Sequence, residues 1–434
     1  MNITICRAGL TCALFSIISA VHATDEEILT LQLEEYEKRL DLLERRVSER
    51  QSISQHKTGN AFNPAISIII DGIYASYKNN PDDYVLPGYS LGGESELAAE
   101  GFSLGHSEIT MSSNIDDKFF GQFSVALAEH GDEVEVELEE AFFETLALGH
   151  GFTIRGGRFF SGIGYLNQQH EHAWDFHDAP LIYRGIFGKQ YFDDGVRVTY
   201  IPPTDLYVEL GIEAFAGGKY PAGGGHSNVG SWTGFVNVGG DVDISHSWQA
   251  GLSYWLADDI EREYGSHVHT GTAETPLFEG DSNIVGVNMI YKWAPGGNTL
   301  EQNFKLQFEY FSRDEEGDLT LLNSSPLEES GLSSEQDGWY LQGIWQFDRS
   351  WRTGIRYDML DSDNSGSDVA VLDEVGLIAG GHTPTRSSIM MEWLPSEFSR
   401  IRLQYNRDDS YQDTDNQIFL QYTFSIGAHG AHTY

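Results

Sequence analysis

The stretch Ile418-Phe419-Leu420-Gln421-Tyr422-Thr423-Phe424-Ser425-Ile426, close to the C-terminus, decides the fold class. From Ile418 to Ile426 every second residue is apolar or aromatic, and after Phe419 the residues between them are polar. Because side chains alternate between the two faces of a strand, this pattern predicts a strand with one apolar face and one face in water. Any half-buried sheet contains such a strand, so the pattern is decisive only because it recurs along the chain.

From Phe62 onward, alternating segments are separated by short turns and by longer polar loops. Turn-forming residues mark the short turns at 116–117, 149–151, 202–205, 245–247, 295–297, 347–349 and 395–397. The longer loops cover about 78–100, 129–133, 161–194, 216–229, 258–281, 314–334, 361–385 and 408–416. Seven turns alternating with eight loops predict about sixteen strands. Short turns on one side and long loops on the other are typical of transmembrane barrels. We therefore expect an all-β chain forming an antiparallel transmembrane β-barrel over residues 62–434.

The tryptophans support this topology. Five of them lie near short turns: Trp248, Trp293, Trp345, Trp351 and Trp393. Three others lie beside long loops: Trp232, Trp255 and Trp339. Two such groups are expected where aromatic rings line both surfaces of a membrane. A barrel of sixteen strands is also expected to leave an aqueous lumen.

The segment in front of the barrel predicts a signal peptide, a short helix and a linker. Arg7, an apolar run from Ala8 to Ala20 and the ending Val21-His22-Ala23 indicate a secretory signal over residues 1–23. A heptad seam predicts a coiled-coil helix over 24–52, followed by a linker over 53–61. The seam consists of Leu29, Leu33, Tyr36, Leu40, Leu43 and Val47. It implies self-association; a helix docked on a periplasmic partner is the alternative.

The charge balance narrows the class of partner. The chain has 26 basic and 66 acidic residues and a formal net charge of -40, which argues against nucleic acid as a partner. It suits a surface or a lumen that attracts cations. The alternative is that acidic loops keep an extracellular face soluble. Both cysteines, Cys6 and Cys12, lie inside the expected signal, so no disulfide or cysteine-based metal site is expected.

Histidine pairs in two long loops indicate a possible metal site. His170-x-His172 and His267-x-His269 each place two imidazoles on one side of an extended segment, a spacing that can chelate zinc or copper. Asp175 and His177 follow the first pair closely enough to add ligands. The alternative is that these are ordinary polar loop residues. No catalytic motif is readable, so we expect neither an enzyme nor a resident cofactor, and zinc would be cargo or a loop-bound ion.

Several longer motifs resemble one family. They are Phe62–Ser67, Gly101–Gly105, Gly157–Asn167 with His170, His172 and Ala173–Phe176, Asp193–Val196, Pro203–Leu206 and the Gly427-Ala428-His429 ending. These stretches resemble proteobacterial outer-membrane proteins labelled zinc-regulated or TonB-dependent outer-membrane receptors. The layout is also similar to that of the phosphate-selective porins O and P, trimeric barrels with a short coiled coil in front. Only residues 24–61 precede the barrel, which leaves no room for a plug domain, so TonB is doubtful as a partner.

The resemblance implies a homotrimer in contact with the lipid of a bacterial outer membrane, and a link to zinc through His170, His172 and His177. In sixteen-stranded porins the third long loop folds inward, so loop 161–194 is the expected constriction. Its lining residues are expected to be Tyr165, Glu171, Trp174, Asp178 and Arg184. The expected function is a porin-like channel or receptor for uptake of a small solute, a metal cation such as zinc or a metal complex. The alternatives are a siderophore porin or receptor that binds a metal chelate, and an envelope anchor without transport.

Overall fold

The computed structural model describes residues 64–434 except 131–132, 225–228, 265–274, 412 and 428–434. The chain divides into the units Met1–Asn63 and Pro64–Tyr434. The signal peptide, coiled-coil helix and linker expected in the first unit all lie outside the described residues.

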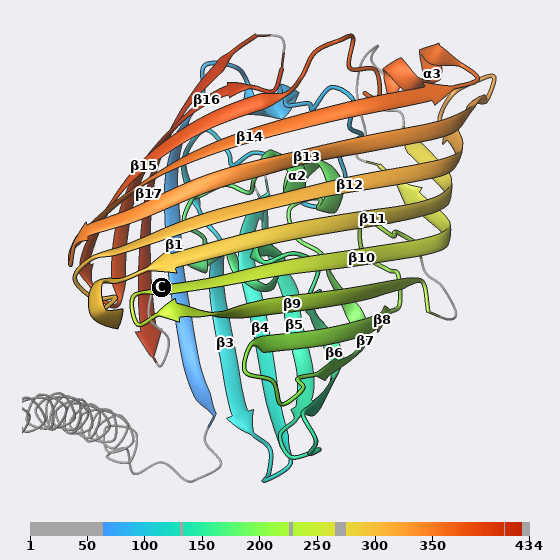
Figure 1. The fold of residues 1–434 in the computed structure, drawn as a ribbon. Coiled ribbons are helices and arrows are strands. Elements are labelled where there is room, and N and C mark those ends of the chain that lie inside the picture. The colour runs from blue at the N-terminus through green and yellow to red at the C-terminus, as the bar shows by residue number, and fades with distance from the viewer. Residues whose placement is uncertain (1–63, 131–132, 225–228, 265–274, 412, 428–434) are drawn as a thin grey trace, which may run out of the picture. The chain divides into compact units, whose positions relative to one another are not determined.

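The described residues form one closed antiparallel sheet (Figure 1). Its strands are β1 (Ala65–Ser76), β2 (Gly101–Leu104), β3 (Ser107–Asn114), β4 (Phe119–His130), β5 (Glu133–Thr145), β6 (Phe152–Phe160), β7 (Phe192–Tyr200), β8 (Tyr207–Phe215), β9 (Ser231–Asp243), β10 (His246–Glu263), β11 (Pro276–Trp293), β12 (Asn303–Leu321), β13 (Glu328–Asp348), β14 (Trp351–Gly366), β15 (Thr385–Ser396), β16 (Ser399–Asp409) and β17 (Asp415–Gly427). Strand β17 pairs with β1 and closes the barrel. Both β2 and β3 pair with β1, so they share one position, and the described sheet is the expected sixteen-strand barrel.

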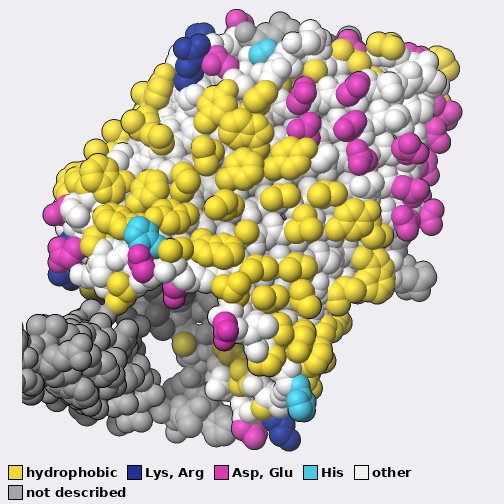
Figure 2. Space-filling model, viewed as in Figure 1, with side chains coloured by type: hydrophobic (Ala, Val, Ile, Leu, Met, Phe, Trp, Pro, Cys, Tyr) yellow, Lys and Arg dark blue, Asp and Glu magenta, His cyan; other side chains and the backbone are white. Residues whose placement is uncertain are grey.

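The last strand behaves as its alternation predicts. The apolar positions from Ile418 to Ile426 face outward and are 42–55% exposed in the isolated chain, while Phe419, Gln421 and Thr423 are buried against the interior. The same apolar face continues around the wall as a broad band of hydrophobic side chains (Figure 2). This band is the surface that lipid would cover.

Strands β10 to β14 are longer than the sequence suggests. They contain 16 to 21 residues, whereas about 9–11 cross a membrane. Much of the chain expected as loops at 258–281 and 314–334 is therefore strand. Acidic residues such as Glu279, Asp314 and Glu316 are exposed on these extensions, while Leu319 and Leu321 are buried inside. Figure 2 shows acidic side chains gathered on one part of the outer face. The acidic residues suggested loops, but the inward apolar positions keep the chain in the sheet.

Four of the eight tryptophans assigned to the two groups are exposed on the outer face, as expected. Trp232, Trp345, Trp351 and Trp393 are 41–50% exposed on the outer face. Trp255 is an exception, because its side chain is fully buried. It packs in the core described next, so its position beside a loop does not make it a membrane-surface residue.

The barrel interior holds a hydrophobic core rather than a wholly aqueous lumen. Two connections fold inward: loop L1 (residues 77–100) with helix η1 (Pro81–Asp83), and loop L3 (residues 161–191) with η2 (Leu166–Gln168), η3 (Glu171–Ala173) and α2 (Leu181–Phe187). Figure 1 shows α2 enclosed by the barrel, where it contacts β12, β13 and β14. Phe187 of α2 packs on Phe311, while Leu360 and Trp255 belong to the same core. The expectation of an open aqueous lumen is therefore wrong for this region.

Two short helices complete the described residues. Helix α3 (Val369–Glu374) packs on β13 and β14, and η4 (Pro295–Gly297) follows β11. Among the described residues, no helix is long and apolar enough to cross a membrane.

Candidate functional site

Loop L3 crosses the barrel between two walls of opposite character. The acidic wall consists of buried carboxylates on β1, β3 and β5, which are Asp71, Glu108, Glu139 and Glu140. The basic wall consists of cationic side chains on β12 and β14–β16, which are Lys305, Arg352, Arg356, Arg386 and Arg402. Asp358 and Glu392 lie among these cations and form ion pairs with some of them. The first half of L3 presents histidines to the acidic wall, and its middle presents aspartates to the basic wall.

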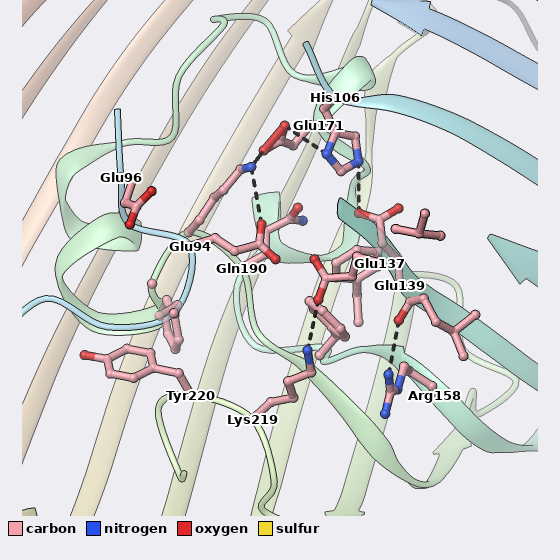
Figure 3. Close-up of a pocket in the computed structure, with 18 residues that line it drawn as sticks. Glu94, Glu96, His106, Glu137, Glu139, Arg158, Glu171, Gln190, Lys219 and Tyr220 are labelled. Atoms are coloured by element: carbon pink, nitrogen blue, oxygen red, sulfur yellow. Dashed lines mark hydrogen bonds and ion pairs between the residues drawn. The ribbon is translucent and has the colours of Figure 1, made fainter. Parts of the chain in front are cut away.

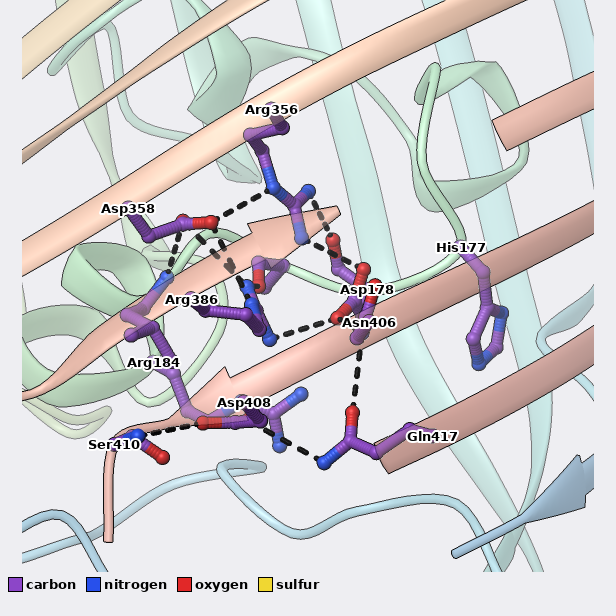
Figure 4. Close-up of polar contacts among 12 residues, drawn as sticks. His177, Asp178, Arg184, Arg356, Asp358, Arg386, Asn406, Asp408, Ser410 and Gln417 are labelled. Atoms are coloured by element: carbon purple, nitrogen blue, oxygen red, sulfur yellow. Dashed lines mark hydrogen bonds and ion pairs between the residues drawn. The ribbon is translucent and has the colours of Figure 1, made fainter. Parts of the chain in front are cut away.

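Two aspartates fasten L3 to the basic wall. Asp175 forms ion pairs with Lys305 at 2.6 Å and Arg352 at 3.2 Å. Asp178 forms ion pairs with Arg356 and Arg386, both at 2.7 Å (Figure 4). Burial opposes ionisation of Asp178, but the two guanidinium groups outweigh this and lower its pKa. Both aspartates and the three arginines are buried, so loss of either aspartate would leave a buried positive charge without its partner, at a large free-energy cost.

The same wall also binds the loop backbone. Arg402 donates to the carbonyl of Trp174 at 2.6 Å, and Arg386 donates to the carbonyl of Ala179 at 2.7 Å. The first backbone N–H of helix α2, that of Leu181, donates to Asp358 at 2.9 Å. These bonds satisfy backbone carbonyl and N–H groups of the loop that water cannot reach, so L3 is held in one position across the barrel.

Glu309 of β12 provides a further anchor at the start of the loop. Its carboxylate accepts hydrogen bonds from the backbone N–H of Tyr165 at 2.7 Å and of Leu166 at 3.1 Å. It also accepts from the hydroxyl of Tyr183 at 3.0 Å. One buried carboxylate thus joins the beginning of L3 to helix α2, which lies near the end of L3.

At the acidic wall, His170 and His172 meet a group of buried glutamates. Nδ1 of His172 lies 3.0 Å from a Glu108 oxygen, and Nδ1 of His170 lies 3.1 Å from the same oxygen. Nε2 of His170 lies 3.0 Å from Glu140, and Nε2 of His106 lies 3.0 Å from Glu139. We call His106, Glu108, Glu139, His170 and His172 the histidine–glutamate cluster. Burial lowers the pKa of His170, but its bonds to the three glutamates outweigh burial and raise it well above its ordinary value.

Two irregularities in the sheet aim these groups inward. The ladder between β4 and β5 shifts between Ser124 and Val125, so Glu139 has no partner and both Glu139 and Glu140 are buried. Such a bulge turns consecutive side chains toward one side of a sheet. The gap between β2 and β3 likewise presents His106 inward beside Glu139.

A cavity of about 740 Å³ lies beside this cluster and between L1, L3 and β5 (Figure 3). Among the described residues, five carboxylates line it, which are Glu94, Glu96, Glu137, Glu139 and Glu171. Three cations accompany them: Lys189, which pairs with Glu171 and Glu94; Lys219, which pairs with Glu137; and Arg158. Burial raises the pKa of Glu94, but Lys189 and further contacts outweigh it and lower that pKa to about 2. The cavity therefore carries an excess of negative charge.

The structure brings only part of the expected metal-ligand set together. His170 and His172 lie in the cluster, but Asp175 lies at the basic wall. His177 packs against Phe419 with ring centroids 5.1 Å apart, and burial lowers its pKa to about 4. His267 and His269 lie outside the described residues.

The expected constriction residues divide into two groups. Glu171 lines the cavity of about 740 Å³, and Tyr165 lines a second cavity of about 370 Å³. Trp174, Asp178 and Arg184 are instead buried in contacts that hold the loops in place. Arg184 donates to two backbone carbonyls of L1, at 2.6 and 2.7 Å, and so ties L1 to L3.

Four residues near the histidines were missed from the sequence: His106, Glu108, Glu139 and Glu140. A signal was present for two of them. The run from Val134 to Leu138 alternates strictly between apolar residues and glutamate, and the doubled Glu139-Glu140 breaks that alternation. Such a break is what a bulge produces. For His106 and Glu108 the sequence offers no comparable signal.

Comparison with known proteins shows which structures share this fold. No model of a known protein family matches the chain. An uncharacterized protein of Aquifex aeolicus (strain VF5) is 29% identical over 404 residues, which cover 86% of this chain and 80% of that protein. Among solved structures, OmpT, an outer membrane protein of Vibrio cholerae, is similar with a TM-score of 0.52 at 10% identity, covering 85% of this chain and 99% of OmpT. The outer membrane channel DcaP of Acinetobacter baumannii has a TM-score of 0.50 at 13% identity, covering 84% of this chain and 97% of DcaP.

These comparisons change two expectations. The resemblance to zinc-regulated or TonB-dependent receptors is not confirmed, because the structures found are those of barrel porins and channels. The expectation that the chain is not an enzyme, drawn from missing motifs, is withdrawn. OmpT chains are similar in structure at 10–11% identity, and likenesses at this level establish a shared fold alone. The neighbours point to a bacterial outer membrane, and the chain has the sixteen-strand barrel fold of the outer-membrane porins.

Proposed function

We propose that this protein is an outer-membrane channel for uptake of a small cation, with loop 161–194 as its constriction. The observation that carries the proposal is the seat of L3, which is bound to the basic wall through Asp175 and Asp178 and meets the acidic wall through His170 and His172. A solute that passes through the barrel has to pass this loop. The channel class rests on the shared fold, and the constriction rests on these contacts.

The charge of the cavity supports a cationic solute. Its five carboxylates outnumber its three Lys and Arg side chains, and they lie in a concave, partly desolvated space. Such a space raises the local concentration of cations. We propose a metal cation such as zinc, or a small metal complex, as the solute.

The chelate receptor is the weaker alternative. It requires aromatic side chains of L3, namely Tyr165, Trp174 and Tyr183, to face a bulky ligand. Trp174 and Tyr183 are 2% and 0% exposed and belong to the hydrophobic core. Tyr165 lines the cavity of about 370 Å³.

Metal flux into proteoliposomes tests the proposal. Purified protein is reconstituted around an entrapped zinc-sensitive dye, and external Zn²⁺ is added. We expect entry faster than into protein-free liposomes, and slower entry in Glu94→Gln, which reduces the negative charge of the cavity. Glu279→Gln is the control, since Glu279 is exposed on the outer face of β11. Equal entry with and without protein would reject the channel.

The N-terminal segment belongs to the proposal as well. We propose residues 1–23 as a cleaved signal, 24–52 as a coiled coil that forms a homotrimer and 53–61 as a linker to the barrel at 62–434. A trimer form of OmpT among the similar structures, with a TM-score of 0.50, supports a trimer. Deleting residues 24–61 while keeping 1–23 should reduce the mass measured by light scattering to that of a smaller assembly and leave flux intact. Loss of an envelope phenotype with unchanged flux would favour the anchor alternative.

A further inference from the structure

We propose that the histidine–glutamate cluster binds a divalent transition-metal ion such as Zn²⁺. Its ligands would be His106, Glu108 and Glu139 from the barrel wall and His170 and His172 from loop L3. The site deepens the proposed function by naming the ion and its ligands, and it rests on that function in treating the ion as the solute of the channel.

The positions of the donor atoms carry the proposal. One donor atom each from His106, Glu108 and Glu139 lie within 4.8 Å of one another. The ring nitrogens of His170 and His172 lie 3.1 and 3.0 Å from the same Glu108 oxygen. Ligands about 2.0–2.2 Å from a tetrahedral zinc ion lie roughly 3.4 Å from one another. Glu108 belongs to both sets of contacts, so an ion bound beside it could draw its four ligands from the wall and from the loop.

Several of these atoms lack the hydrogen bonds that burial normally requires. Both ring nitrogens of His106, Nδ1 of His170 and Oε2 of Glu139 are buried without a hydrogen bond of acceptable geometry. Coordination to one ion would satisfy these atoms together, whereas their mutual ion-pair contacts do not.

The donor set defines the class of ion. Imidazole nitrogens with carboxylate oxygens suit zinc and its transition-metal neighbours, while Mg²⁺ and Ca²⁺ prefer oxygen ligands alone. Glu108, Glu139 and the adjacent Glu140 surround the imidazoles with negative charge, and a dication that binds there would displace ring protons from the ligating nitrogens. Glu140 also lies 3.0 Å from Nε2 of His170, where it can orient that ring.

The ion would have a route to the cluster. His106 and Glu139 line the cavity of about 740 Å³, together with Glu171, which lies 3.4 Å from the other ring nitrogen of His106. Because two ligands belong to L3 and three to the wall, a bound ion would also fasten the loop to β3 and β5.

Zinc binding to the purified full-length protein in detergent tests the site. Calorimetric titration with ZnCl₂ should give one ion per chain. X-ray absorption spectroscopy should find nitrogen and oxygen ligands at about 2.0–2.2 Å from the zinc ion. The His170→Ala/His172→Ala double variant and Glu108→Gln should each weaken binding by about tenfold or more. If the double variant fails to fold, as judged by its thermal unfolding, Glu108→Gln alone decides.

Two control variants make the test specific to the cluster. His177→Ala removes a buried histidine of the same loop that lies outside the cluster, and His267→Ala/His269→Ala removes the other His-x-His pair. Both should bind zinc like the original chain. Absence of binding by the original chain, or binding lost only in His267→Ala/His269→Ala, would overturn the site. Zinc binding without flux would reject the channel and keep the site; flux without binding would reject the site and keep the channel.

Discussion

Among single residues, Asp178 binds L3 to the basic wall through four side chains. Its carboxylate pairs with Arg356 and Arg386 and accepts further bonds from Gln404 and Asn406, at 2.7 and 2.8 Å. Asp178→Asn removes one of the two carboxylates that pair with the buried guanidinium groups of Arg356 and Arg386 and leaves them only Asp358. We expect a loss of about 3 kcal/mol or more in unfolding free energy, and protease cleavage within L3.

A matched control is available in the same region of sequence. Asp194 pairs with Arg158 at 2.8 Å, but its side chain is 58% exposed. Water screens such a pair, so Asp194→Asn should cost less than about 1 kcal/mol and leave L3 resistant to protease. Equal destabilisation by both substitutions would show that the Asp178 contacts do not hold the loop.

His177 predicts a pH dependence of stability. Burial lowers its pKa to about 4, with nearby Asp178 opposing the shift and Arg402 adding to it. An unfolded chain protonates this ring near pH 6.5, whereas the folded chain does not until about pH 4. The contribution of His177 to the free energy of unfolding is therefore complete above pH 6.5. It falls as the pH drops toward 4, by roughly 3 kcal/mol in all.

The substitution His177→Gln isolates this contribution. Thermal unfolding between pH 7.5 and 4.5 should show the original chain losing more stability than the variant, by roughly 2 kcal/mol. Identical pH profiles for the two proteins would mean that His177 titrates normally in the folded state.

At the residue scale, the sequence predicted part of the site. The spacing of His170 and His172 indicated that both imidazoles lie on one side, and the structure brings them together. Nothing near them in sequence indicates Glu108, because it lies on β3 and meets the histidines only where L3 folds into the barrel. Asp175 follows closely in sequence, yet buried cations on β12 and β14 draw it to the opposite wall.

At the scale of elements, the contact between L1 and L3 decides how the interior is filled. Gly188 ends helix α2 with a φ of +61°, and its carbonyl accepts from the backbone of Glu94 at 2.8 Å. A Cβ on Gly188 would lie 2.4 Å from the carbonyl oxygen of Gly92. Because this neighbour is backbone, L1 would have to move away from L3.

Gly188→Ala should therefore disturb the docking of L1, and Gly380→Ala separates the clash from backbone strain. Gly380 has the same φ of +61°, but no atom lies within 4 Å of its Cβ position. Both substitutions add about 1–2 kcal/mol of strain, and only Gly188→Ala adds the clash. We expect greater loss of thermal stability and faster hydrogen exchange in L1 for Gly188→Ala. Equal effects would indicate that the tight contact between the loops is unimportant.

The strands could be predicted from the sequence where their two faces contact different media, one apolar and one polar. The alternation in β17 is complete because lipid would cover one face and polar groups of the interior meet the other. Beyond the membrane the outer face meets water, so acidic residues such as Asp314 and Glu316 replace apolar ones without ending β12. Composition alone does not distinguish such an extension from a loop.

For the whole molecule, the location of charge matters more than its sum. Part of the acidic excess lies on the outward face of the long strands (Figure 2), as expected for a face that stays soluble in water. Inside, acidic groups on β1, β3 and β5 face arginines on β14–β16, with L3 between them. The net charge of -40 predicted neither wall, because the count contains no information on which strands are neighbours.

The reversal potential of the purified protein in a planar bilayer, measured under a salt gradient, tests the central claim most directly. We predict a cation-selective current that rises in Asp178→Asn, because release of L3 from the basic wall widens the passage, and that is unchanged in Asp194→Asn. An anion-selective current, or no current from either the original chain or Asp178→Asn, would contradict the account of L3 as the constriction of a cation channel.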